Sequence, residues 1–209
     1  MLKTFFFDFD GVLVDSAKIK AEGFFELLFP KYRAFESQIR SYVEIHGGVS
    51  RFEKFRYIYN EILKETLTDS QSKQLCDNYA ELVLQRVKSA PEIKGVVEFL
   101  NKLGPQRRAY VVSGSPQIEL RQIVSERAWG GIFAEVLGSP TPKAPLLASL
   151  IKAENISPKN AVFFGDSITD FEAASHSHVE FVGIGTPWEN SKGKWFKDFT
   201  CIQPQDFER

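Results

Sequence analysis

The feature that most constrains the fold is an apolar run near the start of the chain, which leads directly into two acids and a glycine. This run, TFFFDFDG over residues 4–11, predicts a buried strand of a parallel sheet that ends just before Asp8. Gly11 permits a sharp turn, so Asp8 and Asp10 come at the carboxyl end of the strand, where open α/β sheets bind ligands. Carboxylates this close repel each other, and a divalent cation would relieve that repulsion. The alternative interpretation is a loop rich in turn-forming acids.

Three later segments decide between these interpretations. They are YVVSGSP at residues 110–116, TPKAP at 141–145 and VFFGDSITD at 162–170. The order is a strand ending in DxDG, a strand ending in Ser-Gly, a lone lysine, and a strand ending in GDxxxD. This order resembles the haloacid dehalogenase superfamily of phosphohydrolases, and the resemblance covers essentially the whole chain.

Length and charge are those of an ordinary soluble globular protein. The 209 residues are enough for one α/β domain with a small insert. A net charge of −1 creates no overall field that would attract nucleic acid or an anionic membrane. No apolar run reaches membrane-spanning length and no secretion signal is visible, so we expect a cytoplasmic protein. We expect it to be a monomer or a weak dimer.

Residues 16–88 read as four helices without a strand. The first begins after Ser16 and is expected to end at Pro30, and the second is expected over 33–45. Ser50 and Thr68 each precede an acid or amide by three residues, a pattern that predicts the start of a capped helix.

From Pro91 onward strands and helices alternate. Strands are expected at 108–112, 135–137, 161–164 and 181–184, with a further possible strand at 200–202. Helices are expected between them, at 93–103, 116–129, 144–154 and 170–176. The pattern predicts an α/β fold, with a doubly wound, Rossmann-like parallel sheet formed by residues 1–15 and 89–209. The resemblance implies that residues 16–88 are an inserted helical cap, which covers the carboxyl edge of the sheet and excludes water when it closes.

The resemblance also implies roles for the acids. Asp8 corresponds to the nucleophile, which forms an aspartyl phosphate. Asp10 corresponds to the general acid and base, and we expect its pKa to be raised by burial and by the nearby Asp8. Asp166, the Asp8 carboxylate and the Asp10 main-chain carbonyl would bind Mg²⁺. Asp170 would bind the metal through water or orient Lys143.

Two further positions correspond to the phosphate-binding groups of the family. Ser113 and the Gly114 amide match the turn that binds the phosphoryl group, and Pro116 starts a helix whose N-terminus suits an anion. Lys143 matches the lysine that neutralises the phosphoryl group and the nucleophile. Proline precedes Lys143 here, whereas many relatives place it directly after the lysine. Lys152 and Lys159 are therefore kept as alternatives.

The cap contains GVSR at residues 48–51, which resembles the specificity loop of the β-phosphoglucomutases. Arg51 falls at the first helical position, where a cation opposes the helix dipole. Because helix stability gives no reason for a cation there, we expect Arg51 to bind a second acidic group of the substrate. The alternative is an arginine that lies in solvent at the surface.

Three functions are kept open by the sequence. The first is a Mg²⁺-dependent phosphatase that hydrolyses a small phosphorylated metabolite through an aspartyl phosphate on Asp8. The second is a sugar-phosphate mutase of the β-phosphoglucomutase type, which is disfavoured because Lys20 stands where mutases carry a histidine. The third is a catalytically inactive protein that binds a phosphorylated ligand.

Overall fold

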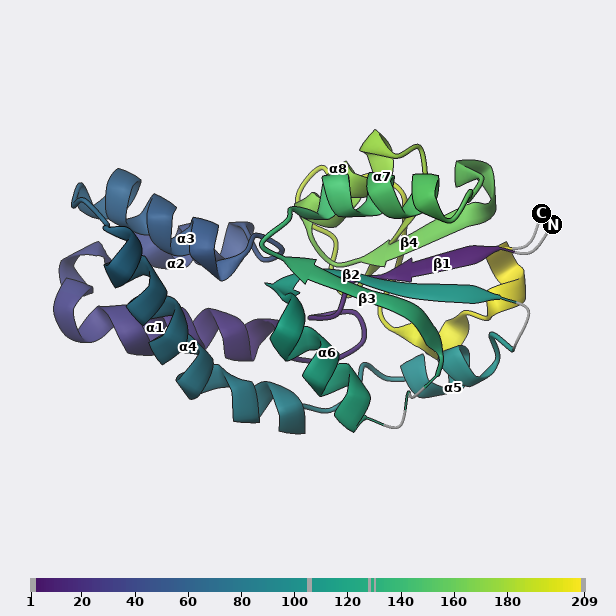
Figure 1. Ribbon diagram of the computed structural model, residues 1–209, viewed down its shortest axis with the longest axis horizontal. Coiled ribbons are helices and arrows are strands. Elements are labelled where there is room, and N and C mark those ends of the chain that lie inside the picture. Colours follow the sequence, from purple (N-terminus) through teal and green to yellow (C-terminus); the bar gives the residue numbers. More distant parts are fainter. Residues whose placement is uncertain (1–2, 105–106, 128, 130, 208–209) are drawn as a thin grey trace.

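The computed structural model describes residues 3–104, 107–127, 129 and 131–207, and its centre is a parallel sheet with helices on both faces (Figure 1). The sheet has six strands in the order β3-β2-β1-β4-β5-β6. The strands are β1 (Thr4–Phe7), β2 (Arg108–Pro116), β3 (Phe133–Ser139), β4 (Ala161–Gly165), β5 (Glu180–Ile184) and β6 (Lys194–Phe196). The first strand of the chain therefore lies at the centre, between β2 and β4. This is the doubly wound α/β sheet that the sequence predicts.

Successive phenylalanines of β1 point to opposite faces of the sheet, because side chains alternate along a strand. Phe5 and Phe7 pack with α5 (Val96–Asn101) and α6 (Gln117–Glu126), whereas Phe6 packs with α7 (Lys143–Ala153) and α8 (Ile168–His176). All three phenylalanines are fully buried. A strand covered on both faces has no need of polar alternation, which explains its unbroken apolar sequence.

Four helices between β1 and α5 form the cap. They are α1 (Ala17–Tyr32), α2 (Glu36–Ile45), α3 (Arg51–Tyr57) and α4 (Asp69–Ser89). They pack around an aromatic cluster in which the ring centroid of Phe24 lies 4.8 Å from that of Phe55 and 4.5 Å from that of Tyr79. The cap lies beyond the carboxyl ends of the central strands (Figure 1). This arrangement supports our proposed division into a core of residues 1–15 and 89–209 and a cap of residues 16–88.

One helix boundary in the cap differs from the prediction, and one helix of the cap is irregular. Pro30 does not end α1, which continues to Tyr32 with the proline inside its last turn. There the proline removes only one helical bond, and the burial of Phe29 and Tyr32 around it offsets that loss. The helix that Ser50 caps is interrupted at Tyr57 and continues as a π-helical turn over Ile58–Leu63.

The C-terminal segment also differs from the prediction. No strand forms at 200–202, because the Asp198 carboxylate accepts a hydrogen bond from the Thr200 amide (2.9 Å) and caps a 3₁₀ turn, Phe199–Cys201. The sixth strand is β6, which lies a few residues earlier in a segment rich in lysine. The helix expected at 116–129 includes residue 128, which lies outside the described residues, and α6 ends at Glu126.

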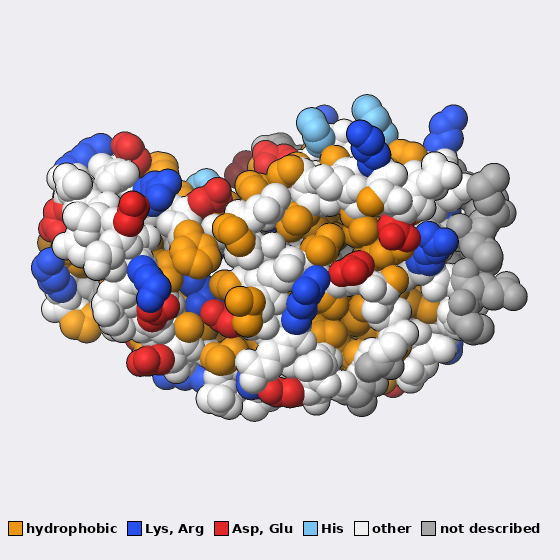
Figure 2. Space-filling model, viewed as in Figure 1, with side chains coloured by type: hydrophobic (Ala, Val, Ile, Leu, Met, Phe, Trp, Pro, Cys, Tyr) orange, Lys and Arg blue, Asp and Glu red, His pale blue; other side chains and the backbone are white. Residues whose placement is uncertain are grey.

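The surface in view mixes charges of both signs. Figure 2 shows lysine, arginine, aspartate and glutamate side chains interspersed over this face, without a large patch of one sign. Across the described part of the chain, no helix has the length and apolar character needed to span a membrane.

Candidate active site

The predicted site residues come from the ends of neighbouring strands and from the start of a helix. Asp8 follows β1, Ser113 and Gly114 lie near the end of β2, and Asp166 follows β4. Lys143 is the first residue of α7. These residues line one cavity of about 790 Å³ between the sheet and the cap, together with Asp10 and Arg51. The folded chain therefore gathers the residues that the motifs singled out, and Asp170 alone among them lies behind the cavity wall, in contact with Lys143.

Asp8 and Lys143 form a buried ion pair. The Lys143 ammonium lies 2.9 Å from Asp8 Oδ2, and each side chain is less than 5% exposed. The other oxygen, Asp8 Oδ1, is buried without a hydrogen-bond partner. Burial, with Asp170 and Asp10 nearby, raises the pKa of Asp8 to about 7 against the opposing effect of Lys143. One carboxylate oxygen is thus held by the lysine, and the other is left free to react or to bind a ligand.

Asp170 is fully buried, and other protein groups occupy both of its oxygens. Asp170 Oδ1 accepts a hydrogen bond from Lys143 (2.6 Å), and Oδ2 accepts hydrogen bonds from the Ser167 hydroxyl (2.6 Å) and amide (3.1 Å). Gly165 gives it room, because a Cβ there would lie 2.2 Å from Asp170 Cβ. This geometry favours the second predicted role, in which Asp170 orients Lys143.

Three carboxylates converge in this part of the site. Oxygens of Asp8, Asp166 and Asp170 lie within 4.8 Å of one another. Burial and the nearby charges of Asp8 and Asp170 raise the pKa of Asp166 well above its usual value. Gly11 has φ +81°, and a Cβ there would lie 2.0 Å from Asp166 Oδ2, so the loop can approach Asp166 only with glycine.

These groups fit a magnesium ion. Lys143 supplies one positive charge against three carboxylates, and the unpartnered Asp8 Oδ1 offers a ligand atom. Hard oxygen donors are the ligands that Mg²⁺ prefers. Asp8 and Asp166 would hold it, with the main-chain carbonyl of Asp10 as the third predicted ligand.

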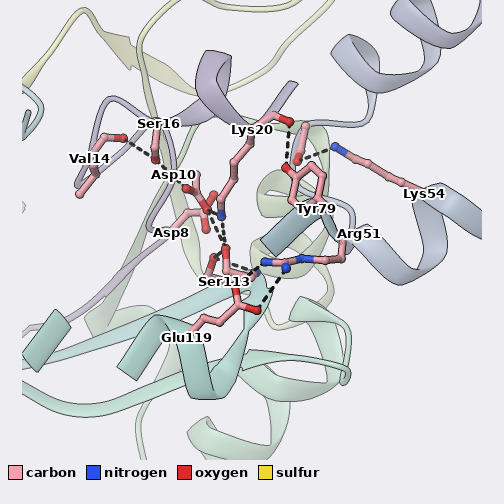
Figure 3. Close-up of polar contacts among 12 residues, drawn as sticks. Asp8, Asp10, Val14, Ser16, Lys20, Arg51, Lys54, Tyr79, Ser113 and Glu119 are labelled. Carbon is pink, nitrogen blue, oxygen red and sulfur yellow. Dashed lines mark hydrogen bonds and ion pairs between the residues drawn. The ribbon is translucent and has the colours of Figure 1, made fainter. Parts of the chain in front are cut away.

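The pKa of Asp10 is shifted in the opposite direction from the prediction. Its carboxylate accepts hydrogen bonds from Ser16 (2.6 Å), from Ser115 (2.7 Å) and from the Lys20 ammonium (Figure 3). Burial raises the pKa of Asp10, but Lys20 and the two hydroxyls outweigh this effect and hold the pKa below its usual value. The expectation of a raised pKa was therefore wrong, because it took account of Asp8 and omitted Lys20.

Lys20 is a site residue that the sequence reasoning did not assign a role. It comes from α1 of the cap and also contacts Ser115 Oγ at 2.5 Å. Its main-chain carbonyl accepts a hydrogen bond from Tyr79 (2.8 Å), which fixes it against α4. The sequence did contain one indication of this role, because Lys20 occupies the position at which mutases carry a histidine.

The cap loop contacts the phosphate-binding turn directly. A Cβ at Gly114 would lie 2.4 Å from the Gly48 carbonyl oxygen, and a Cβ at Gly48 would lie 1.9 Å from Thr169 Oγ1. Ser113 is buried below this contact, where its hydroxyl accepts a hydrogen bond from the Ser115 amide (3.2 Å). Two glycines therefore let the backbones of cap and core meet, and the structure is that of a closed cap.

Arg51 starts α3 as predicted and forms a second bridge between cap and core. Its guanidinium makes two hydrogen bonds to Glu119 of α6, at 2.5 and 3.1 Å (Figure 3). It also lies over the ring of Tyr79, 4.9 Å from the centroid. Glu119 supplies the structural reason for a cation at this position that the sequence reasoning did not find. A substrate anion would have to share Arg51 with Glu119.

A double-variant experiment separates these two roles of Arg51. We expect Arg51→Met and Glu119→Gln each to lower kcat/KM by roughly tenfold for an acidic and a neutral phosphate ester alike, because either change breaks a charge-assisted bond that holds the cap closed. The double variant should be no worse than the single ones. A loss confined to acidic esters in Arg51→Met, with no effect of Glu119→Gln, would instead support the sequence-based hypothesis that Arg51 binds substrate.

Comparison with known proteins agrees with the motifs. The family model of the haloacid dehalogenase-like hydrolases matches residues 5–184. A phosphoglycolate phosphatase from Psychrobacter arcticus is 30% identical over 193 residues, covering 85% of this chain and 81% of the relative. Another, from Aquifex aeolicus, is 26% identical over 214 residues and covers 98% and 94% of the two chains.

Two solved structures share the fold at low identity. β-Phosphoglucomutase from Clostridium difficile superposes with a TM-score of 0.80 at 14% identity, covering 97% of this chain and 94% of the other. CbbY from Rhodobacter sphaeroides, solved in complex with phosphate, has a TM-score of 0.74 at 12% identity and covers 96% of both chains. At such identities they show the architecture alone. From the family match and the converging strand-end acids, the chain belongs to the haloacid dehalogenase-like hydrolases.

Proposed function

We propose that this protein is a Mg²⁺-dependent phosphatase that hydrolyses a small phosphorylated metabolite through an aspartyl phosphate on Asp8. The observation that carries the proposal is Asp8 itself, with one oxygen held by Lys143 and the other unpartnered at the cavity wall. The names of the two phosphoglycolate phosphatases support a small substrate. A cavity of about 790 Å³ is in the range of small-molecule sites.

The chain's own groups divide the work of phosphoryl transfer. Asp8 attacks phosphorus, while Lys143 and the Gly114 amide offset negative charge on the phosphoryl oxygens. A bound Mg²⁺ would supply further positive charge to the phosphoryl oxygens. The bond to the ester oxygen breaks, and that oxygen takes a proton to leave as an alcohol.

Asp10 is placed to move that proton and to activate water in the second step. Its ionised form, favoured by Lys20, suits the removal of a proton from the water that hydrolyses the aspartyl phosphate. For the first step it must carry a proton. The negative charge of an incoming phosphoryl group raises the pKa of a nearby carboxyl group and would favour that protonated form.

The alternatives are less well supported by the same site. Fold similarity to β-phosphoglucomutase is compatible with a mutase. At the position where the resemblance leads one to expect a histidine, however, this chain has Lys20, which is bonded to Asp10. An inactive binding protein would have no need of a nucleophile, a lysine and a group of metal-binding acids in mutual contact.

A panel of phosphate esters tests the proposal. We expect the purified protein to release inorganic phosphate from at least one small ester in the presence of Mg²⁺, since Asp8 is placed to form the aspartyl phosphate and Asp10 to activate the water that hydrolyses it. Sugar phosphates in the panel should be assayed for isomerised product as well. Isomerisation without phosphate release would establish the mutase, and binding of esters without either product would establish the inactive binder.

A further inference from the structure

Lys54 is a buried cation of the cap that the mechanism above does not use. It lies on α3, one turn after Arg51, and its side chain lines the cavity although only 5% of it is exposed. Figure 3 shows its ammonium pointing from α3 toward the side of the cavity where Lys20 and Tyr79 lie. The sequence reasoning did not single it out, because a lysine inside a short amphipathic helix reads as a solvated residue.

The other cations of the cavity wall have carboxylate partners. They pair as Lys20 with Asp10, Arg51 with Glu119, Lys143 with Asp8 and Asp170, Lys18 with Glu22, and Arg40 with Glu36. Lys54 donates to the main-chain carbonyl of Gly47 at 3.2 Å and lies 5.3 Å from the ring centroid of Phe24. Within the described part of the chain, no carboxylate oxygen lies within the 4.0 Å of an ion pair from its ammonium.

A buried ammonium without a counter-ion is unfavourable, and its neighbours make it more so. Burial and the positive charges of Lys20 and Lys143 lower the pKa of Lys54 to about 7, against the opposing effect of Asp10 and Asp166. A carbonyl and an aromatic ring supply only partial negative charge. If the role of Lys54 were purely structural, the folded protein would be more stable with a carboxylate beside it or with an apolar residue in its place.

We infer that Lys54 binds a second anionic group of the substrate, a carboxylate, distal to the phosphoryl group that is transferred. This inference rests on the proposed phosphatase function and narrows its substrate class to phosphate esters of small acids. It assigns recognition of the distal carboxylate to Lys54 and not to Arg51, because Glu119 already neutralises the charge of Arg51. The closed cap brings Lys54 to the cavity wall opposite the core, so the ligand would be held at both ends.

The test compares esters that differ only in the distal group. The short pair is 2-phosphoglycolate and 2-hydroxyethyl phosphate. The long pair is 6-phosphogluconate and sorbitol 6-phosphate. Each pair exchanges a carboxylate for an uncharged hydroxymethyl group. Dissociation constants are measured by calorimetry with Mg²⁺ in an Asp8→Asn background, which prevents turnover. Lys54→Met is then compared with Lys31→Met, an exposed lysine of the same cap.

We expect Lys54→Met to weaken binding of the acid in at least one pair by roughly ten- to hundredfold, the range for a charge-assisted hydrogen bond. The matched hydroxyl ester should change by less than about twofold, and Lys31→Met should have no effect on either. Equal losses for acid and hydroxyl esters, or no loss in either pair, would overturn the inference.

Thermal unfolding provides the second measurement. If Lys54 serves the ligand, Lys54→Met should leave Tm unchanged or raise it, because the change removes an unpaired buried charge. A fall in Tm together with equal losses on all esters would mean that Lys54 supports the loop at Gly47. The proposed function is judged separately, by release of phosphate from the unmodified protein. Charge-selective binding without phosphate release would therefore refute the phosphatase and leave the role of Lys54 standing.

Discussion

Asp8→Asn is expected to lower kcat by about 10⁴-fold or more, because no other group at the site can form the acyl phosphate. The substitution keeps the shape of the side chain and removes its nucleophilic oxygen. Lys143 retains Asp170 as a partner, at 2.6 Å, so the core of the site should stay folded. The measurement is single-turnover and steady-state phosphate release with whichever ester of the panel is turned over fastest.

Asp15→Asn is the matched control, since it makes the same change at an exposed position in the same loop. It should leave kcat within about twofold of the unmodified protein. Asp8→Asn should also unfold at no lower temperature than the metal-free protein, because it removes a repelling charge from the acidic cluster. Activity of Asp8→Asn within about tenfold of the unmodified protein would show that the nucleophile lies elsewhere.

Removal of divalent metal is expected to abolish turnover, and added Mg²⁺ should restore it. Asp166→Ala should raise the Mg²⁺ concentration for half-maximal activity far more than it raises KM at saturating Mg²⁺, since the proposed role of Asp166 is to bind the metal and not the ester. Titrations of activity against Mg²⁺ at fixed substrate, and against substrate at fixed Mg²⁺, measure the two effects separately.

Thermal unfolding measures Mg²⁺ binding at the same site without depending on catalysis. Mg²⁺ should raise the Tm of the unmodified protein, because it binds the folded acidic cluster and not the unfolded chain. The rise should be smaller in Asp166→Ala and unchanged in Asp206→Ala, a control at an exposed acid near the C-terminus. Full activity in excess chelator would contradict the metal site.

The core of the fold and its acids could be predicted because their signals are local. An unbroken apolar run ending in acids marks a strand covered on both faces, and β1 and β4 both follow this pattern. Parallel strands bring their carboxyl ends to one edge, so Asp8 and Asp166 had to come close together once the strands were recognised. The β6 strand was missed because three residues around Trp195, flanked by lysines, carry little such pattern.

Contacts between cap and core could not be predicted, because they depend on how two parts of the chain that are distant in sequence meet. Nothing in the sequence near Arg51 indicates Glu119, which lies 68 positions away on a different helix. The Lys20 bond to Asp10 likewise requires the first turn of α1 to lie over the end of β1. The prediction for the pKa of Asp10 failed for this reason, since its sign is set by a residue that the cap supplies.

The meeting of Gly48 with Gly114 has a consequence for the timing of the catalytic cycle. No side chain stands between the two backbones that could rotate aside and open a passage while the rest of the structure stays still. An opening at this contact therefore requires displacement of the whole loop, together with the helices to which it is joined. Such a displacement proceeds at its own rate, and where the cap opens in each cycle that rate is an upper limit on turnover however fast the bond to phosphorus is broken.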